Sequence, residues 1–311
     1  MIEAQSVSKH FGDLVAVDQL SFSVGPGEVL GFLGPNGAGK STTMKMITGF
    51  IAPSEGSIRV YGHQVENEPV LCKRQIGYLP EGAPSYAEMT PASFLAFIAD
   101  LRGLHGNQRR QRLDYVIERL GLGSVLKQNI ETLSKGFKRR VGLAQAVLHD
   151  PRVLILDEPT DGLDPNQKHE VRELIRDMSS DKIIIISTHI LEEVDAVCTR
   201  ALIIAQGRLL ADDTPDNLAA RSPLHNAVHV GLRDNAQACW LNEALGEMEN
   251  VAAVRLAAGA ASLKVLAKPG KTVLGSVQQL LAARDWTPES LHVERGRLDE
   301  VFREITGGRQ L

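Results

Sequence analysis

The sequence has few cysteines, few aromatic residues and no long apolar run, and each scarcity excludes a class of protein. Cys72, Cys198 and Cys239 lie far apart in the 311-residue chain and form no CxxC pair, which argues against a disulfide scaffold or a zinc site. The most apolar segment, around residues 183–186, is bounded by charged residues. It is shorter than the ~18–20 apolar residues that a membrane-spanning helix needs. The N-terminal segment also lacks the apolar core of a secretory signal.

The charge balance is mildly acidic, with 34 basic and 38 acidic residues giving a net charge of −4. A nucleic-acid-binding protein normally shows a basic field, so the balance disfavours that function. Hydrophobic residues make up 43% and charged residues 23% of the chain, which is typical of a globular protein with a real core. We therefore expect a cytosolic protein in a reducing compartment, for which any membrane role requires a partner chain.

The coarse pattern predicts a helical insert within an α/β sheet domain over residues 1–220. The first 80 residues are typical of strands and turns, including a strand at 75–79. Residues 84–150 show apolar side chains at helical spacing, which predicts a helical subdomain. Continuous apolar strands follow at 153–156 and 182–187. Such strands indicate a parallel sheet covered on both faces.

The composition changes near Arg221, and we expect a separate accessory domain over residues 221–311, joined through residues 221–223. The pattern there predicts the order βαββαβ, which suggests a small α+β, ferredoxin-like unit. Trp240 and Trp286 are interpreted as core anchors. No cluster of ligand-type residues is visible in this segment, so a dimer-stabilising appendage is favoured over a regulatory module.

A complete phosphate-binding motif follows a short apolar strand and precedes a predicted helix. It fits G-x-x-x-x-G-K-[ST] over eight consecutive residues: Gly34, Pro35, Asn36, Gly37, Ala38, Gly39, Lys40 and Ser41. The glycines let backbone N–H groups surround phosphate oxygens, and the helix N-terminus adds partial positive charge. Lys40 is expected to reach the β- and γ-phosphates, and Ser41 to offer its hydroxyl to Mg²⁺. No guanine-reading N-K-x-D motif accompanies this loop, which disfavours a GTPase.

Two acids and a histidine end the later apolar strands. Asp157 and Glu158 directly follow the strand at 153–156, where ligands bind in open α/β sheets. Asp157 is expected to hold Mg²⁺, and Glu158 to take a proton from an attacking water. His189 follows the next strand, so it should lie at the same sheet edge. From the residues alone, contact with the γ-phosphate and a structural role are equally plausible for His189.

Taken together, residues 2–220 resemble the ATP-binding subunit of ABC transporters. The resemblance implies that residues 34–42, with Thr42, are Walker A, and that residues 154–158 are Walker B with its catalytic glutamate. It implies further that Phe11 stacks on adenine, that His189 is the switch histidine, and that residues 162–164 face a partner subunit.

The segment Leu133-Ser134-Lys135-Gly136-Phe137 stands where this family usually has L-S-G-G-Q. The resemblance implies that Ser134 and Gly136 bind the γ-phosphate held by the other subunit. Lys135 replaces a glycine and is interpreted as pointing to solvent rather than adding charge near the phosphate. Glu81 stands where the family has Gln, and it can still ligate Mg²⁺ or its water. Both departures are similar to those of ABC-2 type exporters, including gliding-motility and nitrous-oxide-reductase-maturation ATPases.

The resemblance implies a chain that binds and hydrolyses ATP with Mg²⁺ and powers a membrane permease. One chain carries one set of motifs, so two copies, a homodimer or a pair with a paralogue, would close around two ATP molecules. The partners expected are thus a second ATPase subunit and a multi-span permease, with no nucleic acid. The chain would lie at the cytoplasmic face of the inner or plasma membrane. The alternative is a non-transport ABC ATPase that acts on a soluble macromolecular partner.

Overall fold

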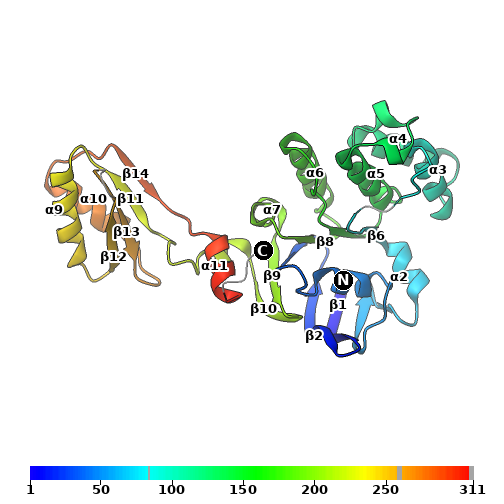
Figure 1. Ribbon diagram of the computed structural model, residues 1–311, viewed down its shortest axis with the longest axis horizontal. Helices are drawn as coiled ribbons and strands as arrows, with labels where there is room; N and C mark the ends of the chain where they lie inside the picture. The colour runs from blue at the N-terminus through cyan, green and yellow to red at the C-terminus, as the bar shows by residue number, and fades with distance from the viewer. Residues whose placement is uncertain (83–84, 258–260, 308–311) are drawn as a thin grey trace. The chain divides into compact units, whose positions relative to one another are not determined.

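The computed structural model describes residues 1–82, 85–257 and 261–307, and the chain divides into two compact units. The first unit runs from Met1 to Thr214, and the second begins at Pro215. Figure 1 shows the elements of each unit. Among the described residues, none of the helices is both long and apolar enough to cross a membrane.

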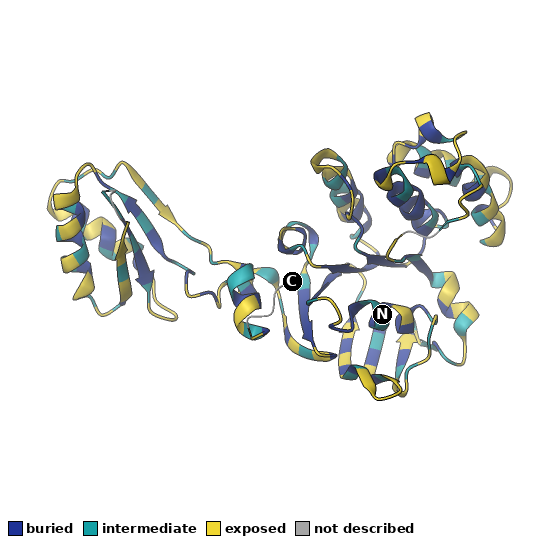
Figure 2. Ribbon diagram, viewed as in Figure 1, coloured by how far each residue is buried: buried dark blue, intermediate teal, exposed yellow. Residues whose placement is uncertain are grey.

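A six-stranded sheet forms the centre of the first unit. Its strands, in spatial order, are β10 (Arg208–Asp213), β9 (Arg200–Ala205), β3 (Val29–Leu33), β8 (Ile183–Thr188), β7 (Val153–Asp157) and β6 (Ile76–Leu79). All neighbours are parallel except β10 and β9. Every residue of β3, β7 and β8 is buried, as Figure 2 shows in dark blue. The expected parallel sheet with two covered faces is confirmed.

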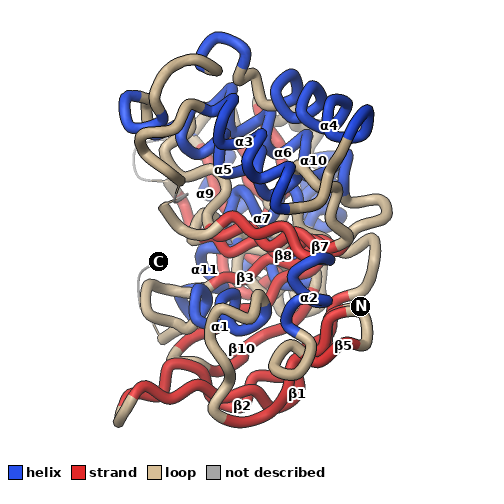
Figure 3. The backbone as a smooth tube through the Cα atoms, turned by 90° about the vertical axis from the view of Figure 1, so that its right-hand side faces the viewer, coloured by secondary structure: helices blue, strands red, loops and turns tan. Residues whose placement is uncertain are grey.

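A second, antiparallel sheet packs against one face of the six-stranded sheet through a shared apolar core. Its strands, in spatial order, are β2 (Leu14–Val24), β1 (Ile2–Phe11), β4 (Glu55–Val60) and β5 (His63–Gln64). Helix α1 (Lys40–Ile47) lies on the same side, and its buried Met44, Met46 and Ile47 belong to this core. Figure 3 shows the central strands between α1 on one side and the larger helices on the other.

The helices on the opposite face include the expected helical subdomain. They are α3 (Pro91–Leu101), α4 (Gly106–Arg119), α5 (Lys135–Val147), α6 (Pro165–Met178) and α7 (Leu191–Val197), with 3-10 turns at Gly123–Val125 and Ile130–Thr132. Val116, Leu143 and Leu174 join this layer to β7 and β8 in one apolar cluster. The helical subdomain therefore rests on the same sheet whose strands β3, β7 and β8 lead into the phosphate-loop, acidic and histidine motifs.

Several elements were not expected from the sequence pattern. Helix α2 (Pro69–Gln75) occupies a region that we predicted as strands and turns, so the predicted strand at 75–79 is one residue too long. Helix α6 was missed although Asp164 and Gln167 form a reciprocal capping box at its start. The resemblance to ABC transporter subunits implies that Asp164 belongs to a loop that faces the partner subunit. In the fold it also satisfies a backbone N–H at the first turn of α6.

After helix α8 (Pro215–Ala219), which was not expected, the second unit has the predicted order βαββαβ and a final helix. Its further elements are β11 (Val228–Gly231), α9 (Asn235–Gly246), β12 (Val251–Leu256), β13 (Ser262–Ala267), α10 (Leu274–Ala283), β14 (Ser290–Val293) and α11 (Leu298–Ile305). The sheet is antiparallel with the order β12-β13-β11-β14. This is the arrangement of a split β-α-β unit. Trp240 and Trp286 pack edge to face, with ring centroids 5.3 Å apart, against the core of this unit.

The division between the units falls earlier in the chain than the predicted boundary at 220/221. Helix α8 packs against α11, and the Ser222 hydroxyl donates to Glu300 at 2.7 Å, so both segments belong to the second unit. The predicted linker at residues 221–223 is therefore part of a folded unit rather than a connection. Its Pro and polar residues signal a tight turn and not a domain boundary.

Candidate functional site

The phosphate loop connects the buried strand β3 to helix α1, and its shape depends on glycine. Gly37 and Gly39 have φ angles of 77° and 102°, a region that side chains other than glycine rarely adopt. A Cβ at Gly39 would lie 2.5 Å from the carbonyl oxygen of Ala16, and one at Gly34 would overlap the carbonyl oxygen of Ile204. The loop can keep this shape only with glycine at these positions.

Lys40 is the first residue of α1 and is only 6% exposed. Its Nζ donates hydrogen bonds to the carbonyl oxygens of Gly34 at 2.5 Å and Pro35 at 3.2 Å, so the side chain turns back over the loop. Burial lowers the pKa of Lys40, and the carboxylates of Glu158 and Asp157 oppose that shift. A buried ammonium group at the first turn of a helix, beside a glycine-rich loop, suits a multiply charged anion.

The loop forms one wall of a cleft of about 440 Å³. Residues 36–42 of the loop, Phe11, Glu81 and Glu158 line this cleft together, whereas Gly34 and Pro35 at the start of the loop do not. Leu14 and Val15, which were not predicted from the sequence, also line the cleft; they are 65% and 45% exposed, and Leu14 pairs with Phe11 across strands β1 and β2. An exposed apolar rim next to an anion-binding floor matches a ligand with a flat ring and a phosphate chain.

Asp157 ends strand β7 and is 1% exposed. Its Oδ1 accepts a 2.6 Å hydrogen bond from the Ser187 hydroxyl, whereas its buried Oδ2 has no partner among the described residues. An orphaned carboxylate oxygen beside a phosphate loop fits a divalent cation or its water. No group of three or more His, Cys, Asp or Glu side chains forms a metal site in the described part of the chain. A cation here would therefore depend on phosphate oxygens as well.

Glu158 and His189 meet at the sheet edge, as expected from two neighbouring strands. The His189 Nδ1 lies 2.8 Å from Glu158 Oε1, and their side chains are 43% and 19% exposed. Glu158 has a φ angle of 52°, an uncommon conformation for a residue with a side chain. The turn presents its carboxylate to the cleft rather than along the strand. Together the pair can accept a proton and keep the acceptor oriented.

Arg139 on helix α5 is a site residue that the sequence analysis missed. Its guanidinium donates to the carbonyl oxygens of Asp157 and Glu158, and to that of Pro80 at 3.1 Å. The side chain is 5% exposed, and burial lowers its pKa while nearby carboxylates oppose the shift. Arg139 therefore joins the backbone of the two acids to the strand end that leads to Glu81. An arginine in a run of basic residues gave no sequence signal, since only the fold turns it inward.

Ser134 and Gly136 do not line the cleft of their own chain. Ser134 is the N-cap of α5 and accepts a hydrogen bond from the Phe137 backbone N–H at 3.3 Å. Lys135, which we expected to point to solvent, is 70% exposed but pairs with Asp161 at 2.8 Å. That contact lowers the pKa of Asp161. The segment thus touches the loop after β7, with Ser134 and Lys135 exposed and Gly136 buried against residues 162–163.

A glycine-shaped phosphate loop, a buried aspartate and an adjacent glutamate at one edge of a parallel sheet define a P-loop nucleoside triphosphatase. The family described as ABC transporter matches residues 17–161. The chain is 32% identical over 308 residues to the linearmycin resistance ATP-binding protein LnrL of Bacillus subtilis (strain 168), covering 99% of this chain and 98% of that protein.

Two further comparisons give the same assignment. The Nod factor export ATP-binding protein I of Sinorhizobium fredii (strain NBRC 101917 / NGR234) is 39% identical over 218 residues, which span 70% of this chain and 64% of that protein. A solved structure of an ATP-binding subunit of an ABC transporter superposes with a TM-score of 0.67 at 32% identity. It covers 70% of this chain and 91% of that one. The chain belongs to the ATP-binding proteins of ABC transporters, and it is an ATP-hydrolysing enzyme.

Proposed function

We propose that this chain supplies the ATPase activity of an ABC-2 type exporter, as one of two ATPase subunits bound to the cytoplasmic face of a membrane permease. The names of two relatives, one for linearmycin resistance and one for Nod factor export, support export as the direction of transport. The observation that carries the proposal is an apolar groove on the first unit that adjoins the strand leading into the ATP cleft.

The groove has a volume of about 650 Å³ and lies where β6, α3 and the end of α1 come together. The groove is lined by Phe50, Tyr86 and Leu101, which are 72%, 58% and 66% exposed. Large apolar side chains grouped on the surface typically mark an interaction site. Tyr78 and Pro80 also line the groove, and the residue after Pro80 is Glu81, which lines the cleft. A short amphipathic helix of the permease would cover these side chains and contact the segment that reaches ATP.

Within the cleft, we assign each residue a role from its position. Phe11 would stack on adenine, and the loop amides with Lys40 would hold the phosphates. The Ser41 hydroxyl and the Oδ2 of Asp157, which has no partner in the described part of the chain, would hold Mg²⁺ with Glu81 nearby. When bound, that ion neutralises charge on the phosphate oxygens.

The hydrolytic step needs a proton acceptor, and the geometry favours Glu158 for that role. Its carboxylate faces the cleft, and His189 holds it at 2.8 Å. In this arrangement Glu158 takes the proton of the attacking water, and His189 orients the carboxylate or the γ-phosphate.

The proposal of a second ATPase subunit rests on the absence of Ser134 and Gly136 from the described lining of the cleft of their own chain. They stand at the N-cap and in the first turn of α5, and a helix N-terminus attracts anions. In a head-to-tail pair this segment would close the cleft of the partner. The exposed Lys135–Asp161 pair contributes ~0–1 kcal/mol, so its ammonium can turn toward the partner's phosphate without large cost.

The test is purification of the Glu158→Gln chain with Mg-ATP from detergent-solubilised native membranes. We expect ATP binding to persist, turnover to fall, and a multi-span membrane protein to be recovered. A second variant, Phe50→Asp, should lose that membrane protein and keep ATP hydrolysis by the purified chain. Leu210→Asp is the matched control, because Leu210 is a 44% exposed apolar residue on edge strand β10, outside the groove.

Recovery of ribosomal or other soluble proteins in place of a permease would support the non-transport alternative. Equal retention of the membrane protein by Phe50→Asp and Leu210→Asp would remove the groove from the proposal. Normal turnover in Glu158→Gln would reject Glu158 as the proton acceptor.

A further inference from the structure

The sheet of the second unit carries a row of basic side chains across its uncovered face. Each of its four strands contributes one residue, and the residues are paired across the strands: Arg255 with Lys264, Lys264 with His229, and His229 with His292. The neighbours Val228 and Val265 alternate to the other face, where α9 and α10 cover them. The row therefore lies on the face away from the helices.

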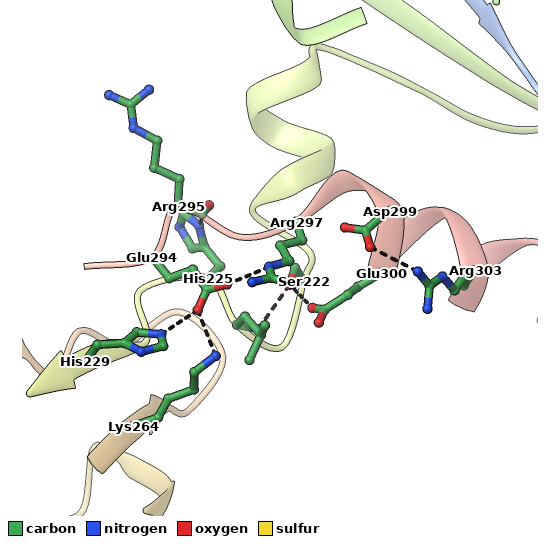
Figure 4. A network of polar contacts seen from close by, with 11 residues as sticks. Ser222, His225, His229, Lys264, Glu294, Arg295, Arg297, Asp299, Glu300 and Arg303 are labelled. Carbon is green, nitrogen blue, oxygen red and sulfur yellow. Dashed lines mark hydrogen bonds and ion pairs between the residues drawn. The ribbon is translucent and has the colours of Figure 1, made fainter. Parts of the chain in front are cut away.

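Most like charges placed opposite one another across strands destabilise a sheet, so the row needs a counter-charge. Glu294 supplies one: its Oε2 accepts hydrogen bonds from His229 Nε2 at 2.8 Å and Lys264 Nζ at 3.0 Å. Its Oε1 accepts one from Arg297 at 2.8 Å. Figure 4 shows these side chains converging on the single carboxylate. Burial opposes ionisation, but these bonds prevail and lower the pKa of Glu294 to about 2.

One carboxylate does not balance the row. The single negative charge of Glu294 is shared by Lys264 and by Arg297, which lies outside the row, so it leaves none for Arg255. The side chain of Arg255 is exposed and has no hydrogen bond or ion pair within the described ranges 1–82, 85–257 and 261–307. His292 stacks on His229 with ring centroids 4.4 Å apart. Arg255, at one end of the row, is thus the cation that Glu294 leaves without a counter-charge.

A pocket of about 480 Å³ lies over this row. Arg255, Lys264, His229 and His292 line it together with the hydroxyl-bearing Ser262 and Ser290. Leu256 and Ala257 add an apolar edge next to Arg255. Guanidinium, ammonium, imidazole and hydroxyl groups are all donors to phosphoryl oxygens, and Arg can bind two of them at once.

We propose that the uncovered face of this sheet is a binding site for a phosphomonoester whose organic part rests on the apolar edge. The four basic residues are spread along the chain from position 229 to position 292, so the sequence shows no cluster. This site is separate from the ATP cleft, and it makes the second unit a ligand-sensing module rather than an appendage. The ligand is a soluble organic phosphate or the headgroup of a phosphomonoester lipid, which share the same phosphoryl group.

The test uses the full chain carrying Lys40→Ala, so that phosphoryl binding in the ATP cleft is weakened. The soluble probe is phenyl phosphate, with inorganic phosphate beside it, measured by calorimetry. The lipid probe is phosphatidylcholine vesicles with and without phosphatidic acid, measured by co-sedimentation. Arg255→Glu removes the free cation from an exposed strand position, and Lys271→Glu makes the same charge change in an exposed turn outside the pocket.

We expect saturable binding of phenyl phosphate or of phosphatidic acid vesicles that Arg255→Glu weakens by about tenfold or more, as for loss of a charge-assisted contact. Lys271→Glu should bind as the parent does. Binding of the soluble probe alone would identify an organic phosphate, and binding of vesicles alone a lipid headgroup. No binding that depends on Arg255, or an equal loss in both variants, would overturn the proposal.

Discussion

Replacing Arg139 with Met should both destabilise the chain and slow ATP hydrolysis. The methionine keeps an unbranched side chain of similar length but removes every donor, so the carbonyl oxygens of Pro80, Asp157 and Glu158 lose their shared guanidinium. Hydrogen bonds to a charged group contribute ~1.5–3 kcal/mol each, and bonds that share one donor group do not add fully. We expect the free energy of unfolding to fall by about 3–5 kcal/mol.

The effect on turnover has a separate cause. Arg139 fixes the backbone of Glu158, and a catalytic group displaced by ~1 Å can lower the rate by about 10²-fold. We therefore expect kcat to fall by between about tenfold and a hundredfold in protein that is still folded. Urea unfolding gives the stability, and steady-state ATP turnover at a temperature where the variant is folded gives kcat.

Arg140 offers a matched control because it is the next residue and is also buried, at 8% exposed. Its guanidinium instead donates to the Leu120 carbonyl at 3.2 Å and to Glu170 at 2.8 Å. Arg140→Met should lower stability without a selective loss of kcat. If folded Arg139→Met turns over ATP at the parental rate, or if both variants lose kcat equally, the positioning role of Arg139 is wrong.

Two further predictions concern charged groups. Lys40→Ala should weaken binding of a fluorescent ATP analogue by about ten- to a hundredfold, the loss of a charge-assisted contact, and unchanged affinity in a fluorescence titration would contradict the role of the loop. The pKa of Glu294 is lowered to about 2, so its ion pairs stabilise the folded chain above its ordinary pKa of 4.5, and that contribution disappears as pH falls from 4.5 toward 2. Glu294→Gln should therefore lose about 1–2 kcal/mol of unfolding free energy at neutral pH, with the difference from the parent shrinking in acid. If the difference in unfolding free energy between Glu294→Gln and the parent grows as pH falls, the pKa of Glu294 is not lowered in the folded chain.

The sequence by itself determined the phosphate loop and the two carboxylates after strand β7. The loop is eight contiguous residues whose glycines, lysine and serine are each required by local backbone shape and phosphate chemistry, so no distant contact is needed to recognise it. The apolar strand before Asp157 likewise predicted a buried strand with an acid at its end. Because neighbouring parallel strands end at one edge, the meeting of Glu158 and His189 also followed from the pattern.

The tertiary structure alone decided which side chains join segments far apart in the chain. Arg139 is one of several basic residues on an amphipathic helix, and only the packing of α5 on the sheet turns it toward Asp157 and Glu158. The basic row of Arg255, Lys264 and His229 depends on the register of antiparallel strands, and a shift of one residue would send its members to the other face. Register and helix packing are set by the whole core, so these contacts have no signature in any short stretch of sequence.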